Sequence, residues 1–276
     1  MASKAPIAGY VDPNFPNPNG PGDAPIIIFG YTPSIVVGVL GVVLFAVSTV
    51  LHAYQISRYR TWYFIPLVVG TAMEVVGYIF RILANRISPY NVIYFVVQYF
   101  MIVVAPVFFS ASIYTILTFL IDAVGRQYSP MPPRALLITF VVSDVVATGV
   151  QVAGAASIGK AQSNRKDPTT ANNILLAGLA FQAVSFLLFI VLLSIFLFRA
   201  RKVAGTTMMP FTLALCASTL LVYLRTCFRL AETAEGLMES LSSNEVYFGC
   251  LEFAPIVVAV YIFNFYHPGK WVPRYR

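Results

Sequence analysis

Long apolar blocks separated by short polar stretches are the dominant pattern of this chain. A helix needs about 20 predominantly apolar residues to cross a bilayer. Because these blocks are apolar on every side, they predict membrane-spanning helices and not the amphipathic helices of a soluble domain. We predict an all-α polytopic membrane protein, a seven-transmembrane helix bundle within residues 31–267. Its spans are placed at 33–54, 62–83, 92–120, 134–157, 173–198, 208–231 and 245–266.

Composition agrees with this pattern and excludes one class of partner. The chain is 58% hydrophobic and only 11% charged, with a net charge of +7, whereas soluble domains are about one quarter charged. A basic chain could bind nucleic acid if its Lys and Arg clustered on a soluble face. Here they flank apolar blocks, where membrane topology places them, so we expect no nucleic-acid partner.

The two ends of the chain are predicted to lie on opposite sides of the membrane. Residues 1–30 are rich in Pro, Gly and Asn and predict a disordered tail, and 268–276 form a short basic tail. Ten Lys/Arg fall in the C-terminal tail and in the first, third and fifth loops, against five in the N-terminal tail and the remaining loops. Cytoplasmic loops carry the positive excess, which predicts an extracellular N-terminus and a cytoplasmic C-terminus.

A set of polar side chains interrupts the apolar spans. A charge in hydrocarbon costs at least about 2.5–3.5 kcal/mol on insertion scales, so such residues face partners or a cavity. Within each span they are spaced to share one helix face. The members are Glu74 and Arg81 on the second span, Gln98 on the third, Asp144 and Gln151 on the fourth, Arg225, Arg229 and Glu232 on the sixth, and Glu252 on the seventh.

These side chains predict a polar cavity that opens toward the outside and is closed by Glu74 and Asp144 near the midplane. Buried ion pairs can also simply fix helix register, and both readings can hold for one cluster. We expect Glu74 to bind ligand or gate the cavity. We expect Arg81 to join the second span to Glu252 or Glu232.

Two prolines and one tyrosine complete the candidate site. Pro106 and Pro255 each remove a helical hydrogen bond, which frees a carbonyl and permits a hinge, although membrane helices also tolerate proline without a function. Tyr78 lies inside the second span and is a candidate for a hydrophobic ligand path, or for helix packing.

Several kinds of chemistry find no support in the sequence. Only two histidines are present, without CxxC or HExxH spacing, so no metal or other cofactor is expected. Neither a G-x-S-x-G nucleophile elbow nor a Walker A motif occurs. We therefore expect a non-enzymatic protein that does not hydrolyse nucleotides.

A family resemblance rests on motifs spread from Tyr31 to Gly269. The chain resembles the fungal RTA-like family (resistance to aminocholesterol; lipid-translocating exporters). The resemblance is carried by Glu74-x2-Gly77-Tyr78-x2-Arg81, Ala105-Pro106-x2-Phe109-x-Ala111-Ser112-Ile113-Tyr114, Asp144-x6-Gln151-x2-Gly154, Arg225-x3-Arg229-x2-Glu232, Glu252 with Pro255, and His267-Pro268-Gly269.

The resemblance implies a seven-helix fungal protein of the plasma membrane. It further implies export or flipping of sphingoid long-chain bases, or resistance to toxic amphiphiles under stress. The leading hypothesis is thus an ATP-independent translocator of amphiphilic lipids whose ammonium group pairs with Glu74, Asp144 or Glu252. The alternative is a seven-helix receptor or lipid sensor that signals through its cytoplasmic loops. Membrane lipids are the expected partners, and a homo-oligomer is left open.

Overall fold

The computed structural model describes residues 10–15, 18, 20, 22–163, 167–201, 203, 208–236 and 239–271. Seven helical segments in it are long and apolar enough to cross a membrane, which confirms the predicted number of spans. The first six are α1 (Ile35–Tyr59), α2 (Ile65–Arg86), α3 (Val92–Val124), α4 (Pro133–Ser163), α5 (Thr169–Ala200) and α6 (Met209–Glu235).

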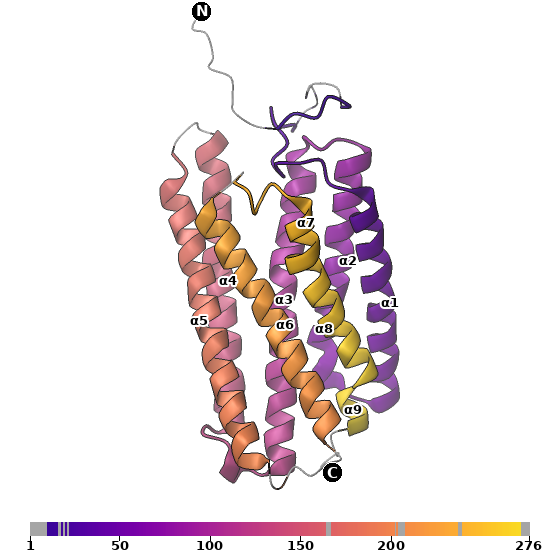
Figure 1. Cartoon of the computed structure of the whole chain (residues 1–276), viewed down its shortest axis with the longest axis vertical. Helices are drawn as coiled ribbons and strands as arrows, with labels where there is room; N and C mark the ends of the chain where they lie inside the picture. Colours follow the sequence, from indigo (N-terminus) through magenta and orange to yellow (C-terminus); the bar gives the residue numbers. More distant parts are fainter. Residues whose placement is uncertain are drawn as a thin grey trace, which may run out of the picture.

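The seventh span is not one regular helix. It consists of α7 (Glu245–Tyr247), the π-helical segment η3 (Phe248–Phe253) and α8 (Ala254–Phe265), followed by the short α9 (Pro268–Trp271). Two single-turn 3₁₀ segments, η1 (Trp62–Phe64) and η2 (Arg126–Tyr128), precede α2 and α4. The segment before α1 and the short α9 lie at opposite ends of the bundle (Figure 1). The end that carries residues 10–34 is called the N-terminal end below.

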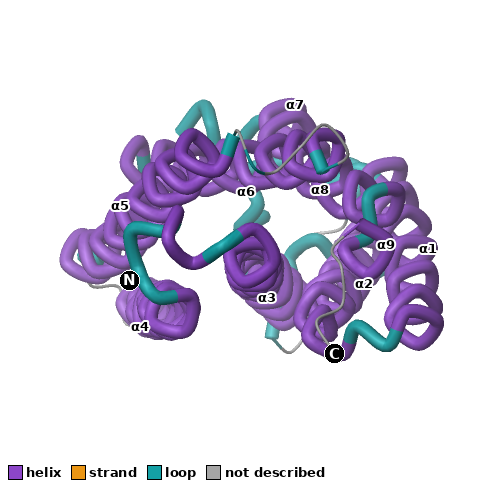
Figure 2. Tube along the Cα trace, turned by 90° about the horizontal axis from the view of Figure 1, so that it is seen from below, coloured by secondary structure: helices purple, strands orange, loops and turns teal. Residues whose placement is uncertain are grey.

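The helices form a closed arrangement in which chain neighbours are also spatial neighbours (Figure 2). From α1 to α6 each helix packs on the next, and α8 packs on both α6 and α1. Helix α3 also contacts α6 across the bundle, so these two helices stand between an α1–α2–α8 side and an α4–α5 side. Residues on α3 and α6 can therefore contact helices on both sides of the bundle.

Small residues let the helices of the α1–α2–α3 side approach closely, as is common in membranes. A Cβ on Gly41 would lie 2.3 Å from the ring of Tyr78, and one on Gly77 would lie 2.8 Å from Ile102. Both values are shorter than side-chain packing allows. Glycine at these positions is therefore required for the observed contacts of α2 with α1 and α3.

The outer surface of the bundle is apolar. Along α1, Val36, Val43 and Val50 recur every seven residues and are 61%, 52% and 68% exposed. Soluble proteins rarely expose such continuous apolar faces. The buried core, by contrast, holds both aromatic side chains and charged ones. This inverted pattern identifies an integral membrane protein whose exterior contacts lipid.

The segment before α1 folds over the N-terminal end, unlike the disordered tail that we predicted. Its backbone bonds to the α2–α3 connection, from the Ala24 N–H to Tyr90 O (2.8 Å) and from the Val92 N–H to Gly22 O (3.1 Å). Ile27 is fully buried there, packed with Tyr90. The prediction failed because it weighed the Pro/Gly composition and overlooked the apolar run 26–29. Residues 1–9 lie outside the described part.

Candidate functional site

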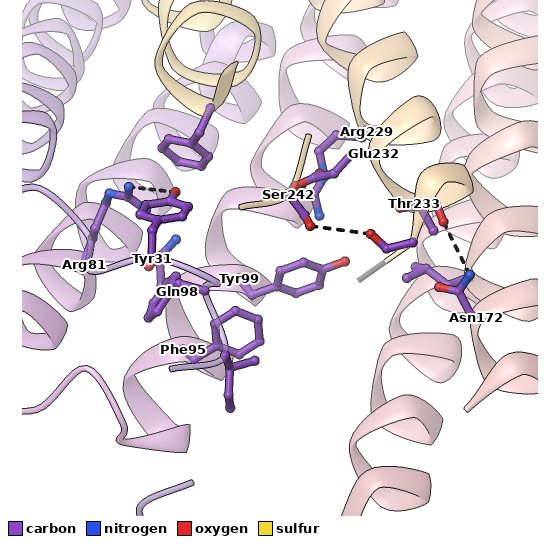
Figure 3. A pocket seen from close by; sticks show the side chains of 15 residues that line it. Tyr31, Arg81, Phe95, Gln98, Tyr99, Asn172, Arg229, Glu232, Thr233 and Ser242 are labelled. Carbon is purple, nitrogen blue, oxygen red and sulfur yellow. Dashed lines mark hydrogen bonds and ion pairs between the residues drawn. The ribbon is translucent and has the colours of Figure 1, made fainter. Parts of the chain in front are cut away.

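A cavity of about 100 Å³ lies at the N-terminal end of the bundle, among α2, α3, α5, α6 and η3 (Figure 3). This volume is below the roughly 300–1,000 Å³ of sites that enclose a drug-sized ligand, so it fits a small polar headgroup and not a whole lipid. The polar residues that line it are Tyr31, Arg81, Gln98, Tyr99, Asn172, Arg229, Glu232, Thr233 and Ser242, and the aromatic ones include Phe29, Phe95 and Phe248.

Arg81 forms one wall of the cavity and holds the N-terminal segment in place. Its fully buried guanidinium pairs with Glu245 and donates a hydrogen bond to the hydroxyl of Tyr31 (3.0 Å). It also lies 4.3 Å from the ring centroid of Phe248, in a cation–π contact. The same Glu245 oxygen accepts the backbone N–H of Ser34 (2.8 Å). Arg81 thus links α2, α7 and the start of α1.

The expected partner of Arg81 was wrong. We predicted Glu252 or Glu232, and the structure shows Glu245, which lies at the very start of the last span and so did not interrupt an apolar block. Its position gave a usable signal, since an acidic residue in the first turn of a helix is favoured by the helix dipole. Asn244 caps that turn by accepting the Val246 N–H.

Tyr31 is a further site residue that sequence reasoning missed. Burial raises its pKa above the ordinary value of 10.0 despite the nearby Arg81. Its hydroxyl therefore stays neutral and accepts the hydrogen bond from the arginine. Because Tyr31 precedes the first span, no intramembrane polarity marked it in the sequence.

Arg229 and Glu232 form the opposite wall of the cavity. Three residues apart on α6, they pair at 2.6 Å between Nη1 and Oε2, and the Arg229 guanidinium lies 5.0 Å from the ring centroid of Tyr99. Tyr99 extends between the Arg81 side and the Arg229 side of the cavity (Figure 3). Beside it, the buried Gln98 has a side-chain oxygen without a hydrogen-bond partner in the described chain.

Arg225, one turn deeper on α6, belongs to a separate and sealed junction. Its Nη2 donates to Glu252 Oε1 (2.5 Å) and to the backbone oxygen of Ile102 (2.7 Å). That carbonyl is free because Pro106, four residues later, has no N–H to donate to it. Pro106 therefore supplies an acceptor for a buried arginine. Its predicted role as a hinge stays a prediction.

Glu252 reaches this junction from the π-helical segment η3. Pro255 cannot donate to the carbonyl four residues before it, and the Ala254 N–H bonds instead to Gly249 O, five residues back. A π-helical turn of this kind re-aims side chains and is common at functional sites. Proline 255 thus accompanies the irregular turn that carries the carboxylate. A hinge at this position also remains a prediction.

Glu74 and Tyr78 lie in the interior near the same junction. Glu74 is 2% exposed and lies within electrostatic range of Arg225 and Glu252. The ring of Tyr78 stacks on Phe45, with 5.6 Å between centroids. Neither residue lines the cavity. The cavity that the structure shows is therefore not closed by Glu74, and a ligand-binding or gating role of this residue stays a prediction.

Asp144 and Gln151 lie on the other side of α3, away from both sites. Asp144 accepts a hydrogen bond from the hydroxyl of Tyr114 (2.9 Å), and the ring of Tyr114 packs against those of Phe140 and Phe189. Gln151 donates to Gln182 on α5 (2.8 Å). The predicted residues thus occupy three places: the cavity, the Arg225 junction and the α3–α4–α5 interior. No group of three His, Cys, Asp or Glu side chains suited to a metal occurs among the described residues.

This combination defines a class of protein: a seven-helix integral membrane protein with a polar cavity at one end and charged side chains in its interior. The sequence model of the RTA1-like protein family matches residues 67–275. That match covers most of the helical domain, and the chain belongs to the RTA1-like family.

Relatives with descriptive names are fungal proteins. The chain is 27% identical over 279 residues to the sphingoid long-chain base transporter RSB1 of Saccharomyces cerevisiae, covering 87% of this chain and 73% of the relative. It is 30% identical to protein RTM1 of Saccharomyces cerevisiae over 223 residues, 72% of this chain and 65% of the relative. The lipid-translocating exporter-like protein RTA1 of Leptosphaeria maculans is 26% identical, with 91% and 53% covered. No solved structure matches the chain.

Proposed function

We propose that this protein is an ATP-independent translocator of amphiphilic lipids, with sphingoid long-chain bases as the substrate class, and that it contributes to lipid homeostasis and resistance to toxic amphiphiles. The names of its relatives support lipid transport. In this proposal the N-terminal end faces the outside of the cell, which the Lys/Arg distribution favours, and the membrane is the plasma membrane, which the resemblance to the family favours.

The observation that carries the proposal is the cavity among helices whose outer faces are apolar. An amphiphile needs a polar site for its headgroup and an apolar surface for its tail. The cavity offers the Glu232 carboxylate and the free Gln98 oxygen as acceptors, which suit an ammonium and its neighbouring hydroxyls. Its volume fits a headgroup alone, so the tail would lie along the lipid-facing helices.

The interior carboxylates have a proposed role in passage. A cationic headgroup that leaves the cavity toward the opposite end would next reach the region of Glu74 and Glu252. Asp144, behind α3, is a proposed gating residue on the other side of the bundle. In this proposal Gln151 adjusts the contact between α4 and α5, and Tyr78 must move to open a path.

Flux of a labelled sphingoid base in proteoliposomes tests the proposal. We expect transport above that of protein-free liposomes, unchanged when ATP is added. Glu232→Gln should weaken headgroup binding about 10–100-fold, because a hydrogen bond to a charged group contributes about 1.5–3 kcal/mol. Glu239→Gln, an exposed acid in the α6–α7 loop, is the matched control and should retain full flux.

Two outcomes would contradict the proposal. Flux equal to that of protein-free liposomes would show that the protein does not translocate the lipid. Saturable binding without flux would favour the receptor alternative. Wild-type flux in the Glu74→Gln, Asp144→Asn double variant would exclude a role of these two carboxylates.

A further inference from the structure

The Arg225 junction contains one more carboxylate than it can neutralise. Arg225 is committed to Glu252 and to the carbonyl of Ile102. Glu74, although 2% exposed, forms no hydrogen bond or ion pair with any residue that the structure describes. Its electrostatic neighbours are Arg225 and Glu252. Two buried carboxylates therefore share one guanidinium.

Among the described residues, the surrounding elements supply no positive charge that is not already paired. Arg229, one turn along α6 and within electrostatic range of Glu252, is paired with Glu232. Helix α1 contributes the ring of Phe45, and α3 contributes the Ile102 carbonyl. On α2, Tyr78 is neutral, and the nearest base, Arg81, is already paired with Glu245. The second oxygen of Glu252 has no hydrogen-bond partner in the described part of the chain. If both acids were ionised, one negative charge would stay uncompensated in a low-dielectric interior, which is strongly unfavourable.

We propose that Glu74 and Glu252 form a proton-binding carboxyl pair, and that one proton leaves this pair when the ammonium of a cationic amphiphile enters. The exchange is balanced in charge: one positive charge replaces another, and Arg225 continues to neutralise the second carboxylate. The proton-binding site rests on the burial and pairing of the charges at the junction and does not depend on the proposed function. The exchange step rests on the proposed translocation of a cationic lipid. It identifies the proton as the ion whose movement is coupled to that of the lipid.

Infrared difference spectroscopy on the purified protein in lipid nanodiscs tests the proton site without any substrate. The Asp144→Asn background removes the other buried acid that lacks a cation. In it we expect the C=O band of a protonated carboxyl group at neutral pH, with the shift that D₂O causes. Glu74→Gln should abolish this band. Glu252→Gln should abolish it too, because the one remaining acid can then ionise against Arg225.

Glu239→Gln, an exposed acid in the α6–α7 loop, is the control and should leave the band unchanged. A band that survives both Glu74→Gln and Glu252→Gln, or that is absent before either change, would overturn the proton site. Dicyclohexylcarbodiimide provides a measurement on the wild-type chain, since it modifies protonated carboxyl groups in apolar surroundings. Mass spectrometry should locate the adduct on Glu74 or Glu252; an adduct confined to other acids would contradict the proposal.

The exchange step is tested in proteoliposomes that enclose a pH indicator. Adding a sphingoid base on one side should move protons in the opposite direction, and an imposed pH gradient should change the initial flux severalfold. Flux without proton movement would contradict the proposed proton coupling but would still support translocation of the lipid. An infrared band without any flux would contradict the proposed function but would still support the proton-binding site.

Discussion

Arg225 and Arg229 lie one turn apart on the same face of α6, yet they belong to different environments. Arg225 pairs with Glu252 across two elements, and the side chains of this pair are 6% and 1% exposed. Arg229 pairs with Glu232 on its own helix, and these side chains are 10% and 17% exposed at the cavity wall. The first pair connects α3, α6 and η3, while the second is local to α6.

The comparison shows that depth and partner decide the role of a buried arginine more than its position on a helix face does. At the cavity wall, loss of the arginine leaves a carboxylate that small polar molecules can reach. In the sealed junction, the same loss leaves charges that no solvent can compensate. Substitutions at the two positions should therefore separate stability from ligand binding.

The largest effect is expected from Arg225→Met. It leaves Glu252 and the Ile102 carbonyl without their shared donor and Glu74 without its nearest positive charge, and breaking a buried pair costs about 3–5 kcal/mol. The apparent melting temperature in detergent should fall sharply, whereas the exposed Arg58→Met should change stability by no more than about 0.5 kcal/mol.

The same variant should become more stable as the pH is lowered, because two acids without a base must take up protons on folding. An unchanged melting temperature, or one that drops further in acid, would show that the junction is less sealed than its contacts indicate.

Arg81→Ala should have the next largest effect. It removes the pair with Glu245, which is partly exposed, and the bond to Tyr31, with a cost of about 1.5–3 kcal/mol. The N-terminal segment should come away from the bundle, so limited proteolysis before α1 should accelerate. Arg86→Ala, an exposed base on the same helix, is the control, and equal protection in both variants would argue against this role of Arg81.

Arg229→Met should destabilise the fold less than Arg225→Met does and should mainly affect transport. The lost pair is local to one helix and its carboxylate borders the cavity, so the melting temperature should fall by less than in Arg225→Met. Sphingoid-base flux should fall, because the unpaired Glu232 changes the charge of the cavity. Destabilisation as large as that of Arg225→Met would show that the two ion pairs do not differ in their contribution to stability.

The smallest effect is expected from acid conditions on the N-terminal segment. The Thr32 hydroxyl (2.5 Å) and the Asn14 N–H hold the pKa of Asp12 below its ordinary value of 3.8. The ionised form is therefore favoured in the folded state. Its stabilising contribution is present above that ordinary value and is lost as the pH falls through the lowered pKa.

Hydrogen exchange at residues 22–34 should thus speed up only below about pH 4, and Asp12→Asn should remove this dependence. The same acid response in the variant would assign it to another group.

Much of this arrangement was predictable from the sequence, although not all of it. The apolar blocks gave all seven spans, and the missing N–H of Pro106 implied a free carbonyl. The seventh span could be located but its π-helical turn could not, because Pro255 is compatible with several local geometries. Glu245 was missed because a charge at a span end also suits an interface.

By itself, the sequence determined what depends on neighbours along the chain: the length and number of the spans, the side of each helix that is polar, and the carbonyl that proline frees. Only the tertiary structure decided which charges meet. Arg81 and Glu245 are separated by 164 residues, and their contact depends on how the helices rotate and cross. In lipid that choice follows from close packing at residues such as Gly41 and Gly77 and from polar contacts between helices, neither of which a single span encodes.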